Sequence, residues 1–212
     1  MIWGSAGHAK VLADIIHLTG GTVIALFDNN PAARSCLADV PLYYGKAGFH
    51  EWLTQQRVLD RLGAAVAIGG SKGRDRLEIA EQLRQSGLRI PPIIHPSCSV
   101  SLTAKVGEGC HILANTVIAA DVHLGSQCII NNGAIVDHEC HLGNGVHVAP
   151  GAVLCGCIDI GDNVLIGAGA TVLPRIQINR NVVVGAGAVV TRDIPEGVTV
   201  VGSPARSIGN SQ

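Results

Sequence analysis

The chain of 212 residues contains no phenylalanine, tryptophan or tyrosine after position 52. The few that it has are Trp3, Phe27, Tyr43, Tyr44, Phe49 and Trp52. Lysine and arginine are also missing from the long segment between Lys105 and Arg175. The second half of the chain must therefore build its core without rings and its surface almost without cations. Such a composition is unusual for a globular domain and indicates a repeat structure.

Other absences exclude whole classes of protein. The formal net charge is −1, so no broad positive surface attracts nucleic acid or an anionic membrane. No apolar run approaches the roughly 18 residues that a membrane-spanning helix needs, and no basic segment followed by an apolar stretch marks a secretion signal. Seven cysteines are an odd number and too few for a disulfide scaffold in a chain of this length. We therefore expect a cytoplasmic protein that binds neither nucleic acid nor membrane.

A six-residue repeat fills the second half of the chain. Every sixth residue from Ile94 to Val190 is isoleucine, leucine or valine, and the next step lands on Glu196. The residue four positions after each of them is small or aliphatic. Four of these small sites hold cysteine, which we expect to act as a small hydrophobic residue: Cys98, Cys110, Cys128 and Cys140. The pattern predicts a parallel β-helix with three short strands in each coil and the aliphatic side chains inside.

A second period of 18 residues lies on top of the first. Glycine follows the aliphatic residue at Gly107, Gly125, Gly143 and Gly161. Three six-residue units therefore make one coil, and we expect these glycines to form its tight corners at positive φ, which glycine adopts without a steric penalty. His123 and His141 are also 18 apart, so they should stack on adjacent coils.

The first 92 residues have a different pattern, and we expect them to form a domain separate from the repeat domain of residues 93–212. Short strands are predicted at 1–3, in TVIALFDNN and in AAVAIGG, and helices in GHAKVLADII and RDRLEIAEQLRQ. This order predicts a small Rossmann-like α/β domain with a parallel sheet. Because no flexible linker precedes the repeat, the two domains should pack firmly.

A glycine turn follows the first predicted strand. The residues from Gly4 to Gly7, GSAG, are a partial version of the dinucleotide fingerprint G-x-G-x-x-G. They form either a tight strand-to-helix turn alone, or a turn whose backbone approaches a nucleotide or sugar. In the second case the diphosphate would lie at the N-terminus of the following helix.

The motifs GSAGHAK, LFDNN, AIGGSKG and DHEC, together with the repeat and the tail VGSPAR, resemble those of the sugar acetyltransferases of the sialic acid O-acetyltransferase (NeuD) and PglD type. The resemblance covers essentially the whole chain. It implies a left-handed β-helix, a homotrimer with active sites between the subunits, and acetyl-CoA as co-substrate without a metal. It further implies N-acetylation of a UDP-linked 4-amino-4,6-dideoxy sugar in cell-surface glycan biosynthesis.

The same resemblance implies roles for individual residues. His138 would be the general base that takes the proton of the sugar amine, and Glu139 would be its carboxylate partner, with Asp137 as the alternative. The residues implied in binding the nucleotide sugar are Ala6, Gly7, His8, Asp28, Asn29, Gly69 and Asn131. Those implied in binding acetyl-CoA are His147, Gly156, Ala168 and Ala186.

The repeat adds a geometric constraint to these roles. His147 follows His138 by half a coil, so the two side chains should point to different edges of the prism. If both serve one reaction, they come from neighbouring subunits, which favours an oligomer. The phosphates of CoA would meet backbone donors or one of the late cations, Arg175, Arg180, Arg192 and Arg206.

Two other functions remain open. One is O-acetylation of a sialic acid or a related sugar, since the same N-terminal sheet is expected in both kinds of enzyme. The other is a β-helix that binds a metal between subunits, in the manner of the hexapeptide carbonic anhydrases, through the pair His138 and His141. A clear third ligand for such a metal is missing, and the N-terminal domain would have no task in it.

Overall fold

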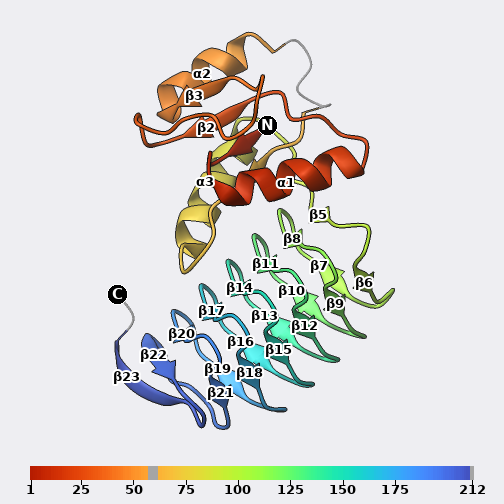
Figure 1. Ribbon diagram of the computed structural model, residues 1–212, viewed down its shortest axis with the longest axis vertical. Coiled ribbons are helices and arrows are strands. Elements are labelled where there is room, and N and C mark those ends of the chain that lie inside the picture. Colours follow the sequence, from red (N-terminus) through yellow and green to blue (C-terminus); the bar gives the residue numbers. More distant parts are fainter. Residues whose placement is uncertain (57–61, 211–212) are drawn as a thin grey trace.

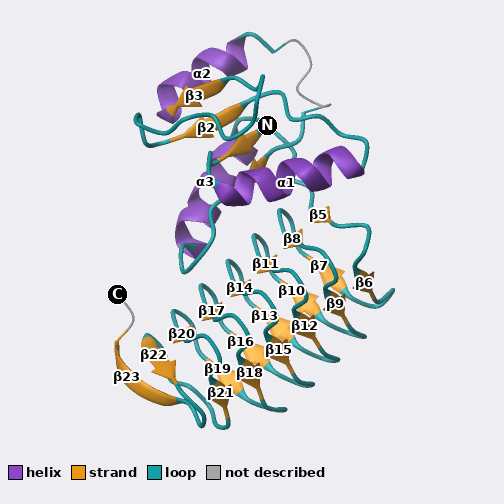
Figure 2. Ribbon diagram, in the orientation of Figure 1, coloured by secondary structure: helices purple, strands orange, loops and turns teal. Residues whose placement is uncertain are grey.

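The computed structural model describes residues 1–56 and 62–210. An α/β unit lies along one side of a long β-helix, and the helices α1 and α3 are nearest to the prism (Figure 1). Within the described part of the chain, none of the helices has the length and apolar composition to cross a bilayer. Figure 2 shows that the three helices of residues 1–56 and 62–210 belong to the N-terminal unit and that the rest of this described part consists of strands and turns.

The N-terminal unit is a four-stranded parallel sheet with the order β3-β2-β1-β4, as the predicted Rossmann-like pattern requires. Its strands are β1 (Ile2–Trp3), β2 (Leu26–Asp28), β3 (Leu42–Tyr44) and β4 (Ala65–Val66). Its helices are α1 (Gly7–Leu18), α2 (Gly45–Thr54) and α3 (Gly73–Gln85). The sequence analysis did not predict the edge strand β3. A strand of three residues is too short to show the alternation of apolar and polar residues by which strands are recognised.

Most of the aromatic residues of the chain pack in the core of this unit, whereas Tyr44 is exposed. Trp3 and Phe27 stack with ring centroids 5.6 Å apart, and Phe49 packs edge-on against Phe27 at 5.4 Å. On the other face of the sheet, α1 buries Leu12 and Ile15. The aromatic rings are therefore concentrated between the sheet and the helices of the N-terminal unit, where there is room for them.

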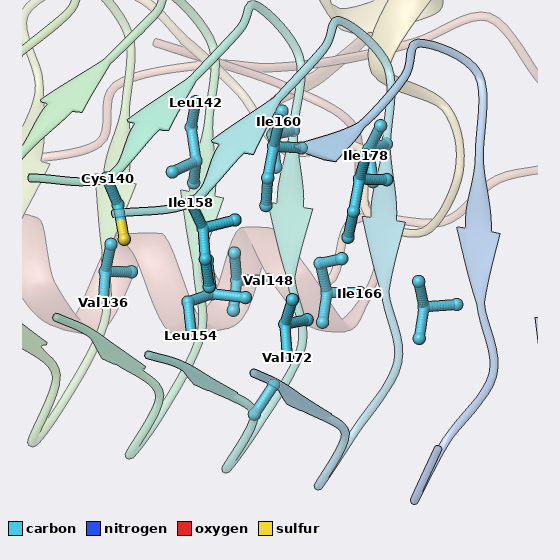
Figure 3. Close-up of a cluster of buried hydrophobic side chains, with 14 of the residues drawn as sticks. Val136, Cys140, Leu142, Val148, Leu154, Ile158, Ile160, Ile166, Val172 and Ile178 are labelled. Atoms are coloured by element: carbon cyan, nitrogen blue, oxygen red, sulfur yellow. The ribbon is translucent and has the colours of Figure 1, made fainter. Parts of the chain in front are cut away.

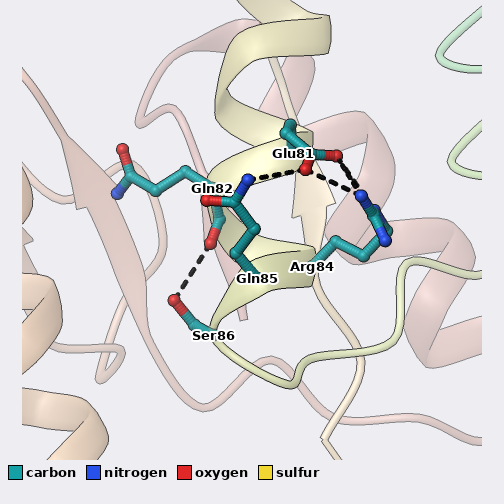
Figure 4. Close-up of polar contacts among 5 residues, drawn as sticks. All are labelled: Glu81, Gln82, Arg84, Gln85 and Ser86. Carbon is teal, nitrogen blue, oxygen red and sulfur yellow. Dashed lines mark hydrogen bonds and ion pairs between the residues drawn. The ribbon is translucent and has the colours of Figure 1, made fainter.

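The C-terminal end of α3 is held by its own side chains. Arg84 donates to both carboxylate oxygens of Glu81, and Ser86 Oγ donates to the carbonyl of Gln82 at 2.9 Å (Figure 4). The ion pair is exposed, so it contributes only a few tenths of a kcal/mol, about the value of an i,i+3 helix pair.

The β-helix has three faces, each a parallel sheet that gains one short strand in every coil. The N-domain face contains β5 (Ile93–Ile94), β8 (His111–Ile112), β11 (Ile129–Ile130), β14 (His147–Val148), β17 (Leu165–Ile166), β20 (Val183–Val184), β22 (Val198–Val201) and the antiparallel β23 (Arg206–Asn210). The apolar face contains β6 (Ser99–Val100), β9 (Val117–Ile118), β12 (Ile135–Val136), β15 (Val153–Leu154), β18 (Thr171–Val172) and β21 (Val189–Val190). The histidine face contains β7 (Lys105–Val106), β10 (His123–Leu124), β13 (His141–Leu142), β16 (Asp159–Ile160) and β19 (Gln177–Ile178).

The core of the prism consists of the aliphatic residues that recur every six positions (Figure 3). They are buried from Ile112 to Val190. Ile94 is instead 36% exposed, because the first coil has no coil beneath it. Cys128 and Cys140 are fully buried in the small site, as expected of small hydrophobic residues.

The expectation for the glycines that recur every 18 residues was wrong. None of the four has a positive φ, and the left-handed corners lie elsewhere, for example at Gly133 and Glu139. A Cβ on Gly125 would lie 2.7 Å from the backbone of Gly143 in the next coil. These glycines are therefore required for the close stacking of coils, since any side chain would meet backbone there.

The two units are joined by buried polar contacts. Arg76 on α3 is fully buried and donates to the carbonyls of Gln127 (3.1 Å), Ile68 (3.1 Å) and Gly145 (2.6 Å). The first residue of α3, Gly73, lies so close to Gly145 that a Cβ would overlap its carbonyl. The firm packing expected from the missing linker thus rests on a guanidinium and a glycine contact.

Candidate active site

His138 and Glu139 form a pair on the open corner between the apolar and histidine faces, between β12 and β13. The Nδ1 atom of His138 lies 2.9 Å from Oε2 of Glu139, and the two side chains are 52% and 60% exposed. Glu139 is one of the corner residues in the left-handed region, with φ of 57°, and its amide donates to the carbonyl of Ala120 at 2.9 Å. The coil therefore fixes the backbone of the pair and leaves the ring accessible.

Hydrogen bonding to Glu139 decides which ring nitrogen is free. Because a carboxylate only accepts, Nδ1 of His138 carries the proton in this contact, and Nε2 keeps its lone pair. Asp137, the alternative partner, instead accepts the backbone N–H of His138 at 2.8 Å. The structure thus places Glu139 rather than Asp137 on the ring.

Gly156, one coil further on, lies directly beside the imidazole. A Cβ at this position would lie 2.5 Å from Nε2 and 2.6 Å from Cε1 of His138. Only a glycine lets the ring occupy its place. Among the described residues, none accepts a hydrogen bond from the Gly156 amide, so the residue beside Nε2 has a free N–H donor.

The glycine turn and Asp28 lie side by side at the ends of β1 and β2. Oδ2 of Asp28 accepts the N–H of Ser5 and Oδ1 that of Asn30, both at 2.9 Å. The carboxylate thus holds the turn in shape. Asn29, the next residue, is exposed beside it.

The N-terminus of α1 begins directly after this turn. Ala6 is its N-cap, with no side-chain hydrogen bond, and the first turn contains no acidic residue. Uncapped N–H groups and the positive end of the helix dipole favour an anion such as a diphosphate there. This agrees with the second interpretation of the GSAG turn.

His8 extends from α1 to the prism. Its Nε2 lies 3.1 Å from Nδ1 of His111 on β8. Burial, together with the charges of His147 and Arg76, lowers the pKa of His8 to about 4. His8 therefore stays neutral between the two units, where its neighbour His111 is fully buried.

His147 is also buried between the two units. Its Nε2 lies 3.3 Å from Nδ2 of Asn131, and its Nδ1 lies 3.3 Å from the carbonyl of Gly70. Burial, together with the charge of Arg76, lowers the pKa of His147 to about 4. Gly69 lies against the same ring, since a Cβ there would be 3.9 Å from Cε1. The predicted residues Gly69, Asn131 and His147 therefore lie together.

Ala168 and Ala186 follow one another on the corner between the N-domain and apolar faces. The amide of Gly187, next to Ala186, donates to the carbonyl of Ala168 at 2.8 Å. Both alanines are exposed. This corner flanks the apolar face on the side opposite to the corner of His138 and Gly156. Within one chain, the predicted residues thus fall into separate groups, and His138 and His147 lie on different edges as expected.

Sequence analysis did not identify Arg76, although a signal was present. Arg76, Ala80 and Leu83 are spaced at i, i+4 and i+7 and are the buried face of α3. An arginine at such a position of an apolar stripe requires buried acceptors.

The predicted stack of His123 and His141 is present on the histidine face. Their ring centroids lie 4.9 Å apart, and Nδ1 of His141 lies 3.5 Å from a carboxylate oxygen of Asp159. Of the described residues, those that could jointly hold a metal ion are His138, Glu139 and Cys157. His141 does not belong to that group, so the pair of histidines considered for a carbonic-anhydrase-like site does not converge within the chain.

Family models of known proteins match both units of the chain. The model of the PglD N-terminal domain matches residues 1–83, and that of the bacterial transferase hexapeptide matches residues 103–138 and 157–192. No curated protein matched the chain.

Three solved structures are similar over nearly the whole chain. A histidine-to-alanine variant of GDP-perosamine N-acetyltransferase from Caulobacter crescentus, in complex with CoA and GDP-perosamine, is 35% identical, with a TM-score of 0.90 over 99% of this chain and 96% of that one. The acetyltransferase domain of PglB from Neisseria gonorrhoeae, in complex with acetyl coenzyme A, is 31% identical, with a TM-score of 0.86 over 98% and 97%. WeeI from Acinetobacter baumannii is 25% identical, with a TM-score of 0.86 over 98% of each chain.

Proposed function

The chain belongs to the sugar acetyltransferases that join a PglD-type N-terminal domain to a left-handed β-helix of hexapeptide repeats, and we propose that it N-acetylates a nucleotide-linked amino sugar. It is an acyltransferase, and acetyl-CoA is its acetyl donor. The observation that carries the proposal is the His138–Glu139 pair, with a free Nε2 on an accessible corner.

The nucleotide sugar would bind at the glycine turn and the N-terminus of α1. The uncapped helix end suits the diphosphate, and Ala6, Gly7, Asp28 and Asn29 border it. The Caulobacter relative was solved with GDP-perosamine, which supports an amino sugar as acceptor. The nucleotide of the substrate, predicted to be UDP, must therefore be tested against GDP. Such a reaction serves the assembly of cell-surface glycans.

In the proposed reaction, Nε2 of His138 accepts a proton from the sugar amine as the nitrogen attacks the thioester carbonyl. Glu139 holds Nδ1–H and stabilises the imidazolium that forms. When the C–S bond breaks, the proton passes from the imidazolium to the departing sulfur, so the products are the amide and CoA. The free N–H of Gly156 is the donor best placed for the oxyanion of the tetrahedral intermediate.

A homotrimer would assemble this site. The apolar face exposes Val117 (36%) and Ile135 (37%) on adjacent coils, and Leu173 (39%) just after β18, two coils further along. Exposed apolar residues aligned in this way favour burial against another subunit. If three copies place this face around a common axis, the corner of His138 in one subunit meets the corner of Ala168 in the next. The pantetheine arm of acetyl-CoA would run along that junction past Gly156, Ala168, Ala186 and His147.

The oligomer is tested by placing a charge on the apolar face. Ile135→Glu should convert trimers to monomers in sedimentation experiments and abolish turnover, because each site needs two subunits. Gln177→Glu on the histidine face is the matched control and should remain trimeric. A trimeric Ile135→Glu variant would contradict the assigned interface.

The reaction is tested by release of the CoA thiol in the presence of acetyl-CoA and a panel of UDP- and GDP-linked sugars. The panel should pair each 4-amino sugar with its 4-hydroxy counterpart and include free sialic acid. We expect thiol release with amino sugars and a product that carries an amide. Thiol release only with hydroxyl acceptors would identify an O-acetyltransferase and refute the proposed N-acetylation.

A further inference from the structure

A cysteine lies beside the His138–Glu139 pair. Cys157 follows Glu139 by one coil on the same corner, and its Sγ lies 3.6 Å from Oε2 of Glu139. This is the oxygen that also contacts Nδ1 of His138 at 2.9 Å. One nitrogen, one oxygen and one sulfur atom thus lie within 4.8 Å of one another.

We propose that His138, Glu139 and Cys157 form a zinc-binding site, and that Zn²⁺ bound there inhibits the enzyme. Imidazole, carboxylate and thiolate are the ligands that zinc prefers, and three protein ligands leave a fourth position for water. This role is distinct from that of a cofactor, because the reaction proposed above has no step in which the ion takes part.

The oxygen–sulfur and nitrogen–oxygen distances are close to those around a tetrahedral ion, and the nitrogen and sulfur atoms lie within 4.8 Å of one another. Bonds of about 2.0 Å to oxygen and about 2.3 Å to sulfur separate those two atoms by about 3.5 Å, and the observed separation is 3.6 Å. Nitrogen and oxygen ligands would lie about 3.3 Å apart at the tetrahedral angle, so the contact of 2.9 Å must open slightly. A small rotation of either exposed side chain supplies that change.

The backbone under the ligands is already in place. Glu139 and Cys157 are both left-handed corner residues, with φ of 57° and 59°. Their amides donate to the carbonyls of Ala120 and His138, each at 2.9 Å. Binding therefore orders only side chains, and the exposed corner gives the ion direct access.

Binding changes the protonation of two ligands. Zinc takes the lone pair of Nδ1 in His138, so the ring proton moves to Nε2, and it replaces the thiol proton of Cys157, which is released to solvent. An Nε2 that carries a proton cannot accept one from the sugar amine. The inhibition thus rests on the proposed function of His138, whereas binding of the ion does not.

The test measures metal binding and turnover separately, on the full chain freed of metal. Calorimetry with Zn²⁺ should give one ion per chain, and Co²⁺ should give sulfur-to-metal charge-transfer absorption. Cys157→Ser should bind at least tenfold more weakly and lose the absorption. Cys155→Ser, two residues away and outside the group, is the matched control and should bind as the unmodified chain does.

Turnover decides the second half of the proposal. Zn²⁺ should inhibit the unmodified chain and Cys155→Ser, a chelator should reverse the inhibition, and Cys157→Ser should retain activity at the same zinc concentration. Equal binding by Cys157→Ser and the unmodified chain would overturn the site. Binding through Cys157 without loss of turnover would establish the site but overturn the inhibition, and with it the role of His138 as base.

Discussion

The contact between Gly156 and the ring of His138 makes Gly156→Ala the sharpest test of the catalytic site. A Cβ would lie 2.5 Å from Nε2, whereas non-bonded heavy atoms stay about 3.5 Å apart. The ring must therefore retreat by about 1 Å. Since the side chain of His138 is 52% exposed, it can swing toward solvent more easily than the coil can deform, and its hydrogen bond to Glu139 is lost.

The expected cost follows from this displacement. Misplacing a catalytic group by 1 Å lowers the rate about 100-fold, which equals about 2.7 kcal/mol of transition-state stabilisation. Stability should hardly change, because Gly156 has no positive φ and alanine restricts the unfolded chain. We expect kcat to fall by two orders of magnitude with the melting temperature preserved. Gly63→Ala is the control, since its Cβ would lie 3.8 Å from the nearest atoms, in Pro91.

A double variant shows whether the effect passes through the ring. If Gly156→Ala acts by displacing His138, it should cost nothing further in a His138→Ala background, because no ring remains to be moved. The N–H of residue 156 is kept in every variant, so the proposed oxyanion donor does not confuse the comparison. Near-normal kcat in the single variant, or full additivity in the double one, would refute the reasoning.

Two further predictions concern the junction between the units. Arg76→Met should lower the free energy of unfolding by about 3 kcal/mol, because three buried carbonyls lose a charged donor. Urea unfolding measures this change. Arg74→Met is the control, because Arg74 lies on the same helix and is exposed. His8 and His147 have folded-state pKa values of about 4, so between about pH 6.5 and pH 4 the unfolded chain binds more protons. The free energy of unfolding should therefore fall on acidification through that window, by up to about 1.4 kcal/mol per pH unit for each histidine. A midpoint of urea unfolding that stays constant from pH 6.5 to 4.5 would contradict this prediction.

Hydrophobic periodicity alone predicted the parallel β-helix of the second half, whereas its left hand was implied by the family resemblance. In a coil of three strands, side chains that recur every six residues all point into the prism. The spacing therefore predicted the burial of the aliphatic residues and of the cysteines in the small site. The same arithmetic predicted the stack of His123 and His141 and the separation of His138 from His147. The pairing of His138 with Glu139 was implied by the family resemblance. Adjacency alone left Asp137 as an alternative, because both carboxylates are one residue from His138, and the structure shows that only Glu139 contacts the ring.

Only the tertiary structure decided which of the side chains that point away from the core of the prism are covered by the N-terminal unit. His111 and His147 occupy the same repeat position as the exposed His141, yet they are buried because the N-terminal unit rests on their face. The period likewise did not distinguish a glycine needed for close stacking from one needed at a left-handed corner. The contact of Arg76 with Gly145 joins residues 69 positions apart that no repeat spacing relates. The 18-residue period places Cys157 one coil after Glu139, but only the structure shows that Sγ lies 3.6 Å from the carboxylate.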